Sequence, residues 1–113
     1  MGTEENKRQK AILDYLRLSR GIFCWRQNNH ATFDGKTWRR HTGMPGISDI
    51  VGIMDDGRFL GIEVKSMKGV QSKAQKVFQS ECNERNAVYI LARNVDDVMK
   101  ALAEVDRCLM LQW

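Results

Sequence analysis

The sequence predicts an α/β fold in which a mixed central β-sheet is flanked by helices. Two observations support this. Segments with helical spacing of apolar residues alternate with short apolar runs typical of strands, and one pair of such runs is joined by Asp56-Gly57. Asp-Gly between two apolar runs indicates a hairpin, because the turn needs a positive φ angle that glycine adopts at little cost. A length of 113 residues fits one domain, residues 1–113.

The first half of the chain predicts one helix, one strand and a long polar segment. The helix runs from Thr3 to Arg20, because Thr3 can cap it, acids occupy its first turn and Gly21 can end it. Residues 22–25 form a short strand, and we expect Trp25 in the core. Residues 26–43 are rich in polar and basic side chains, and a loop this long without regular structure is usually functional or disordered.

The second half predicts a hairpin, two helices and a further strand. The hairpin strands cover residues 50–54 and 59–65, and Ser72 caps a helix from residue 73 to about 85, whose apolar stripe includes Val77 and Phe78. Residues 88–92 are uninterruptedly apolar, as expected for a strand in the middle of a covered sheet. Asn94 caps a last helix over residues 95–103. Residues 108–113 are largely apolar, which leaves room for a terminal strand.

Polar residues gather at one end of the predicted hairpin. Asp49 precedes the first strand, whereas Glu63 and Lys65 close the second and point to the same side of the sheet, because strand side chains alternate. Antiparallel pairing brings Asp49 near Glu63. Two neighbouring carboxylates favour a cation between them, and oxygen ligands suit Mg²⁺ or Mn²⁺. The alternative is a solvated strand end with a surface ion pair.

The spacing of these residues resembles a known active-site signature. Pro45-(x)₃-Asp49, followed after thirteen residues by Glu63-Val64-Lys65, is similar to the motif of the PD-(D/E)XK nucleases. Further sequence segments resemble one branch of these nucleases, the virus-type replication-repair nuclease (VRR-NUC) domain. They are residues 44–52, 57–59, 62–66, 68–69 and 72–75. The resemblance covers essentially the whole chain. It implies a restriction-endonuclease-like core with the Asp strand and the Glu-x-Lys strand at its centre.

The resemblance also implies roles for individual residues. Asp49 and Glu63 would bind the metal with their carboxylates, and Val64 with its backbone carbonyl. Glu5 would complete the ligand shell or hold a second ion; without the resemblance, Glu5 is an ordinary acid at a helix N-terminus. Lys65 would orient the attacking water and stabilise negative charge.

Gln75 is a further residue that the resemblance places near the catalytic lysine. Without the resemblance, Gln75 is an amide on a helix surface. The predicted catalytic set is therefore Asp49, Glu63, Lys65, Glu5 and Gln75.

The distribution of charge predicts a polyanionic partner. The chain has a net charge of +4, and residues 1–42 hold nine Lys or Arg against four Asp or Glu. Basic residues interleaved with an aromatic suit phosphates and an unpaired base. The predicted DNA-binding residues are Arg26, Lys36, Trp38, Arg39, Arg40, Lys68 and Lys73. The alternatives are that the charge only confers solubility and that Trp38 anchors the loop to the core.

Together these features predict a nuclease dependent on Mg²⁺ or Mn²⁺ that hydrolyses DNA. The resemblance implies structure-selective cutting of branched DNA, such as four-way junctions or flaps, by a homodimer. Two alternatives are a catalytically silent DNA-binding module and a small structural protein or nuclease partner. Three widely spaced cysteines favour reduced thiols in the cytoplasm over a zinc site, and no apolar run is long enough to span a membrane.

Overall fold

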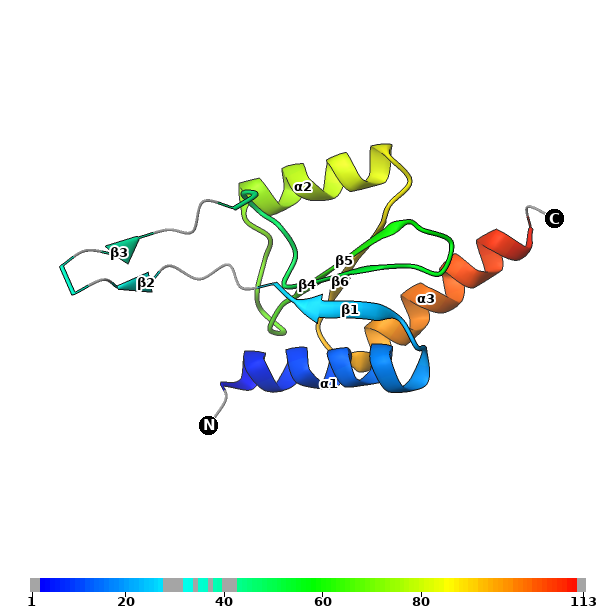
Figure 1. Ribbon diagram of the computed structural model, residues 1–113, viewed down its shortest axis with the longest axis horizontal. Helices are drawn as coiled ribbons and strands as arrows, with labels where there is room; N and C mark the ends of the chain where they lie inside the picture. The colour runs from blue at the N-terminus through cyan, green and yellow to red at the C-terminus, as the bar shows by residue number, and fades with distance from the viewer. Residues whose placement is uncertain (1–2, 28–31, 34, 37, 40–42, 112–113) are drawn as a thin grey trace.

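The computed structural model describes residues 3–27, 32–33, 35–36, 38–39 and 43–111. In these residues three helices and six strands form in the order α1 (Glu4–Ser19), β1 (Phe23–Arg26), β2 (Thr32–Phe33), β3 (Trp38–Arg39), β4 (Ile50–Ile53), β5 (Phe59–Val64), α2 (Lys73–Glu84), β6 (Val88–Ala92) and α3 (Val95–Met110). In Figure 1, α2 lies on one side of the central sheet, and α1 and α3 lie on the other. The predicted mixed sheet flanked by helices is confirmed.

The central sheet has the strand order β1-β4-β5-β6. β4 pairs antiparallel with β1 and with β5, whereas β5 and β6 run parallel. Ile50 lies opposite Ile62, so the start of β4 is beside the end of β5, as the Asp-Gly turn predicts. Gly57 has a φ of 90° in that turn, which explains the need for glycine there. β4 and β5 are the two central strands.

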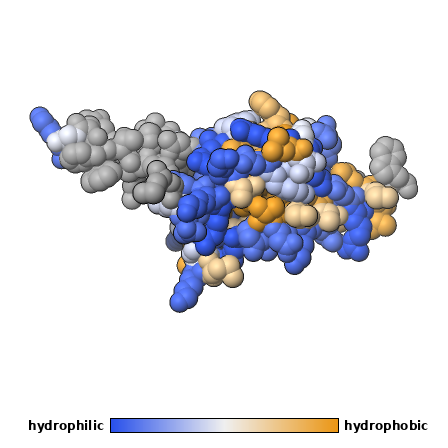
Figure 2. Space-filling model, turned by 90° about the horizontal axis from the view of Figure 1, so that it is seen from below, coloured by the Kyte–Doolittle hydropathy of each residue, from blue (hydrophilic) through white to orange (hydrophobic). Residues whose placement is uncertain are grey.

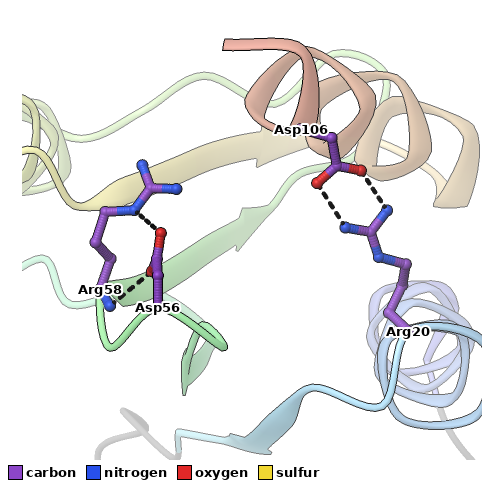
Figure 3. Close-up of polar contacts among 4 residues, drawn as sticks. All are labelled: Arg20, Asp56, Arg58 and Asp106. Carbon is purple, nitrogen blue, oxygen red and sulfur yellow. Dashed lines mark hydrogen bonds and ion pairs between the residues drawn. The ribbon is translucent and has the colours of Figure 1, made fainter. Parts of the chain in front are cut away.

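The hydrophobic core fills the space between the sheet and the pair α1 and α3. Strand side chains alternate, so every second residue of each strand faces these two helices. Completely buried core residues come from the sheet and from both of these helices: Ile12, Leu16, Ile50, Leu60, Ile62, Val64, Val98 and Leu102. Burying each of these side chains contributes about 1.5–3 kcal/mol. An ion pair between Arg20 and Asp106, with a 3.1 Å contact, links the end of α1 to α3 (Figure 3).

The helix caps agree with the sequence. Thr3, Ser72 and Asn94 each accept a hydrogen bond on the side-chain oxygen from the backbone N–H of the third residue of the helix, at 3.1, 3.2 and 2.8 Å. These bonds satisfy N–H groups that have no partner within the helix. Gly21 follows α1 with a φ of 63°, as expected of a glycine after a helix end.

The segment 26–43 is more regular than its polar composition suggests. β2 and β3 pair antiparallel, with Thr32 opposite Arg39 and Phe33 opposite Trp38. β-branched and aromatic residues favour strands, and Gly35 has a φ of 99° between the two. Figure 1 shows β2 and β3 apart from the central sheet.

Two further expectations about elements are wrong. β6 is an edge strand, and its burial alternates: one face belongs to the core and the other lies under α2. Its continuous apolar run therefore reflects cover on both faces and not a central position. α3 continues to Met110 where a terminal strand was expected, because Val98, Leu102, Val105 and Leu109 keep helical spacing. Residues 112–113 lie outside the described part.

Two side chains are more exposed than predicted. Trp25 is 39% exposed, because Cys24 and not Trp25 points to the core side of β1; its ring lies 5.4 Å from that of Phe23. Val77 is 57% exposed, because α2 turns Phe78 and Cys82 toward the sheet instead. No described helix is long and apolar enough to cross a membrane. All three cysteines are free thiols.

Candidate active site

Two carboxylates meet where β4 begins and β5 ends. The antiparallel register of these strands places Asp49, the residue before β4, opposite Glu63. Asp49 Oδ2 accepts a hydrogen bond of 2.8 Å from the Val64 N–H, and the Asp49 carbonyl accepts one of 2.7 Å from the Gln27 N–H. These two hydrogen bonds hold Asp49 through its side chain and its backbone. Neither of them uses Asp49 Oδ1.

Glu63 has a buried carboxyl group, and only one of its two oxygens is hydrogen-bonded within the described residues. Its side chain is 2% exposed, and Oε1 accepts a hydrogen bond of 2.9 Å from Gln75 Nε2. Oε2 is buried and has no hydrogen-bond partner among the described residues. Burial is the main reason that the pKa of Glu63 rises to about 8; the Asp49 carboxylate adds to the shift, and Lys65 opposes it.

This arrangement fits a divalent cation. A cation between the two carboxylates would give Oε2 of Glu63 a partner and offset the repulsion from Asp49. Carboxylate oxygens are the ligands that Mg²⁺ and Mn²⁺ prefer, and Mg²⁺ keeps several waters in addition to one or two carboxylates. The two side chains therefore suit the cofactor that the sequence predicts.

Glu5 is near enough to this pair for its charge to act on Glu63. It is exposed in the first turn of α1, and its charge raises the pKa of Glu63 less than Asp49 does. Within the described part of the chain, no three His, Cys, Asp or Glu side chains are close enough together to hold a metal ion. Two carboxylates are in place, whereas the roles of Glu5 and of the Val64 carbonyl as ligands stay predictions.

Gln75 links the start of α2 to Glu63. Its side-chain oxygen accepts a hydrogen bond of 2.8 Å from the Ser72 N–H, while its backbone N–H donates to Ser72 Oγ. This reciprocal capping box fixes the amide so that its NH₂ group faces Glu63 Oε1. The same side chain therefore caps a helix and orients the buried carboxyl group.

Lys65 follows β5 and is half-buried. Its backbone N–H donates to the Ala92 carbonyl at 2.9 Å, which continues the pairing with β6. The next turn is held from β6, because Arg93 Nη1 donates to the carbonyls of Ser66 and Gly69, the latter at 3.0 Å. Arg93 thus fixes the loop that begins at Lys65.

The loop before Asp49 packs closely on α2. Gly46 has a φ of 74°, and a Cβ atom there would lie 2.2 Å from the Ala74 carbonyl oxygen. Ser48 is fully buried, and its Oγ has no hydrogen-bond partner among the described residues. The Pro45-to-Asp49 part of the predicted motif therefore sits against the first turn of the helix that carries Gln75.

Two of the predicted DNA-binding residues flank this site. Lys68 is exposed in the loop after Lys65, and Lys73 is the exposed first residue of α2. Arg26 ends β1 and is exposed; its guanidinium donates to the Asn6 carbonyl at 3.5 Å. The three residues belong to segments at the end of the sheet where Asp49 and Glu63 meet, and Arg26 extends from the opposite face of the sheet, toward α1.

Three of the remaining predicted DNA-binding residues belong to the two-stranded sheet or to the turn between its strands. Lys36 is exposed between its strands, and Trp38 and Arg39 form β3. Arg40 lies outside the described residues, as do His30 and His41.

Sequence reasoning missed Arg93 and Ser48. Arg93 directly follows β6, and the ends of parallel neighbouring strands meet at one edge of a sheet, so its place beside the loop after Lys65 could have been found once β6 was paired with β5. Ser48 gave no signal of its own, because its burial depends on the packing of the loop against the sheet: a Cβ at Gly61 would lie 2.6 Å from Ser48 Oγ.

The comparisons with known proteins give one match. No protein-family model matches the chain, and no curated protein matches it. A solved structure described as a "VRR_NUC domain" is similar over 90% of this chain and 97% of that chain, with a TM-score of 0.65 and 17% identity. At this identity the likeness concerns the fold. This chain therefore shares its fold with a VRR_NUC domain.

Proposed function

We propose that this protein is a divalent-metal-dependent nuclease that hydrolyses phosphodiester bonds in DNA. The observation that carries the proposal is the buried Glu63 carboxyl group, which faces Asp49 and has an oxygen without a partner among the described residues. The VRR_NUC-like fold is consistent with it. Buried, mutually repelling carboxylates cost stability, so a protein that keeps them has a use for the cation they bind.

Asp49 and Glu63 would hold Mg²⁺ or Mn²⁺. Such an ion, when bound, supplies Lewis acidity that makes water a better nucleophile and neutralises charge on a phosphate. Gln75 keeps Glu63 Oε1 in place through a hydrogen bond of 2.9 Å, and the Val64 N–H does the same for Asp49 Oδ2 at 2.8 Å. These bonds fix both carboxylates before any ligand arrives, which lowers the cost of binding.

Lys65 is the cation that this chain itself brings to the reaction. Residues 63 and 65 lie on the same side of the strand, and the charge of Lys65 already acts on the Glu63 carboxyl group. A fixed ammonium at this position would orient a water molecule and stabilise negative charge that develops on the phosphate oxygens. Lys68 and Lys73 would hold the flanking phosphates.

Cleavage of labelled DNA tests the proposal. We expect the wild type to cut DNA with Mg²⁺ or Mn²⁺ and to leave it intact with EDTA, and Glu63→Ala to be inactive with either ion. Glu104→Ala is the matched control, because Glu104 is an exposed acid on α3, on the opposite side of the sheet from α2. Equal activity of the Glu63→Ala protein would refute the site. Binding of DNA without cleavage by the wild type would favour the silent binding module.

We also propose that the preferred substrate is branched DNA and that the protein acts as a homodimer. Two-fold symmetric junctions need paired cuts, which a dimer with two sites supplies. Rates on a four-way junction, a flap and a linear duplex of equal length test the preference. Equal rates on all three would contradict structure selectivity while leaving nuclease activity itself intact.

A further inference from the structure

The two faces of the central sheet are covered to different extents. The register places Cys24, Ile50, Leu60, Ile62 and Val88 on the face toward α1 and α3, where all are buried. Seen from that side, the surface is largely hydrophilic with smaller hydrophobic patches between the polar side chains (Figure 2).

The opposite face is covered by α2 only over β5 and β6. Phe78 of α2 packs on Phe59 and Tyr89, with ring centroids 6.1 and 6.3 Å apart. Over β1, β4 and the first residue of β5, large apolar side chains remain exposed: Phe23 is 69%, Ile53 46%, Trp25 39% and Phe59 36% exposed. We call these four residues the bare face.

The bare face is one continuous surface. Phe23 lies opposite Ile53, and Ile53 lies opposite Phe59, so the three are neighbours across three strands. The ring of Trp25 is 5.4 Å from that of Phe23. An open groove of about 570 Å³ continues the surface beyond Phe59 toward the C-terminal half of α2. Contiguous apolar surface of this kind marks an interaction site.

A partner at this surface covers the face of the sheet and does not pair with β1, the edge strand that borders it. β1 is an edge strand, but the Cys24 carbonyl accepts hydrogen bonds from Arg17 Nε and Nη2 at 3.2 and 2.9 Å. A side chain on an edge carbonyl blocks the pairing of another strand.

Charge favours a second copy of this chain over a nucleic acid as the partner. The four residues of the bare face are uncharged, and the arginines at the rim of the groove are paired: Arg58 with Asp56 at 2.8 Å (Figure 3) and Arg85 with Glu81 at 2.8 Å. A polyanion would gain little there. Two copies that each carry a net charge of +4 repel one another least through an uncharged surface.

The area also suits a dimer. From their exposed fractions, the four side chains offer roughly 400 Å² per copy, about half of the ~800 Å² that each partner buries in a standard interface. The polar residues around them and the groove supply surface for the rest.

We propose that the bare face is the surface through which two copies of this chain associate, packed sheet against sheet about a two-fold axis. This assignment deepens the proposed homodimer and rests on that part of the proposed function. Phe59 and Glu63 lie on the same face of β5, because they are four residues apart on a strand. The two candidate active sites of such a dimer therefore lie on the side of the sheet that carries the interface, close enough in principle for one branched substrate to engage both.

Sedimentation equilibrium of the purified chain at micromolar concentration tests the surface. We expect the wild type to have twice the mass of one chain and Phe23→Lys to weaken association at least about 100-fold, because a lysine would be buried against apolar side chains. Leu18→Lys is the matched control: Leu18 is 85% exposed on α1, and its replacement leaves the dimer unchanged. Ile53→Lys repeats the test on a second strand. Circular dichroism checks that each variant is folded.

Two results would overturn the proposal. One is a monomeric wild type; the other is a dimer whose affinity is the same in Phe23→Lys and Ile53→Lys as in Leu18→Lys. If instead the wild type is monomeric and Phe23→Lys changes DNA affinity, the bare face contacts nucleic acid. Cleavage is scored separately. A folded, monomeric Phe23→Lys protein that still nicks single strands supports the surface, since Phe23 is not part of the candidate site. A dimer that cuts no DNA refutes the nuclease alone.

Discussion

Glu63 is the residue on which the candidate site depends. Its backbone belongs to a central strand, one side-chain oxygen is held by Gln75, and the other is buried beside Asp49 without a partner among the described residues. A buried carboxyl group under these conditions stays protonated at neutral pH unless a cation stabilises its charged form. The state of Glu63 thus reports directly on metal binding.

Without metal, we expect the free energy of unfolding to decrease as the pH rises, because of Glu63. Its pKa is about 8 in the folded protein and about 4.5 ordinarily, so its contribution is complete below pH 4.5 and is lost as the pH rises through 8. The loss is on the order of a few kcal/mol. Urea titrations in EDTA from pH 5 to 9 measure it. We expect Glu63→Gln to flatten the profile and Glu81→Gln to retain it; parallel profiles for wild type and Glu63→Gln would show that Glu63 does not titrate in this range.

In the proposed mechanism, Lys65 acts on the transition state more than on the cation. Lys65→Met keeps much of the side-chain volume and removes the charge, so we expect a fall in cleavage rate of about 10²–10³ with Mn²⁺ affinity retained. Single-turnover cleavage and a calorimetric titration measure the two quantities. A variant that cuts as fast as the wild type would exclude an electrostatic role for Lys65.

Among the elements, the loop before β4 packs directly against the start of α2. Gly46 permits that contact, because any side chain would meet the Ala74 carbonyl, and the same turn of α2 contains Gln75. The positions of Asp49 and Glu63, of the Gln75 amide and of the loop before β4 therefore depend on this one packing contact.

Replacing Gly46 tests this contact. Gly46→Ala combines a strained φ of 74° with a backbone clash, so we expect a loss of at least about 2 kcal/mol in the free energy of unfolding. Gly43→Ala is the control in the same loop, because a Cβ there meets nothing within 4 Å, and it should change stability by no more than about 0.5 kcal/mol. If Gly46→Ala and Gly43→Ala unfolded at the same urea concentration, this would contradict the packing argument.

The sequence predicted elements whose signals are local. Thr3, Ser72 and Asn94 cap the helices as expected, and the Asp-Gly turn brings Asp49 beside Glu63. What failed depends on tertiary contacts. Trp25 has an apolar side chain that nothing local assigns to one face of β1, and it is exposed. The apolar run of β6 indicated cover on both faces but could not reveal an edge position.

At the scale of the whole molecule, fold and motif agree although overall sequence similarity is low. The matched VRR_NUC domain is only 17% identical over 90% of this chain. A core tolerates substitution as long as volume and pattern are kept, whereas a site that must place two carboxylates and a lysine does not. A run of short matching segments along the chain therefore indicated the fold where the comparisons with family models and curated proteins gave no match.

Calorimetric titration of the folded protein with Mn²⁺ tests the central claim, that Asp49 and Glu63 form a divalent-cation site, most directly. We expect saturable binding by the wild type and its loss in Asp49→Asn with Glu63→Gln, whose side chains keep their shape but lack charge. A double variant of two exposed acids, Asp55→Asn with Glu81→Gln, serves as control and should bind like the wild type. If the variant without Asp49 and Glu63 carboxylates binds Mn²⁺ as tightly as the control, the metal site lies elsewhere and the account is wrong.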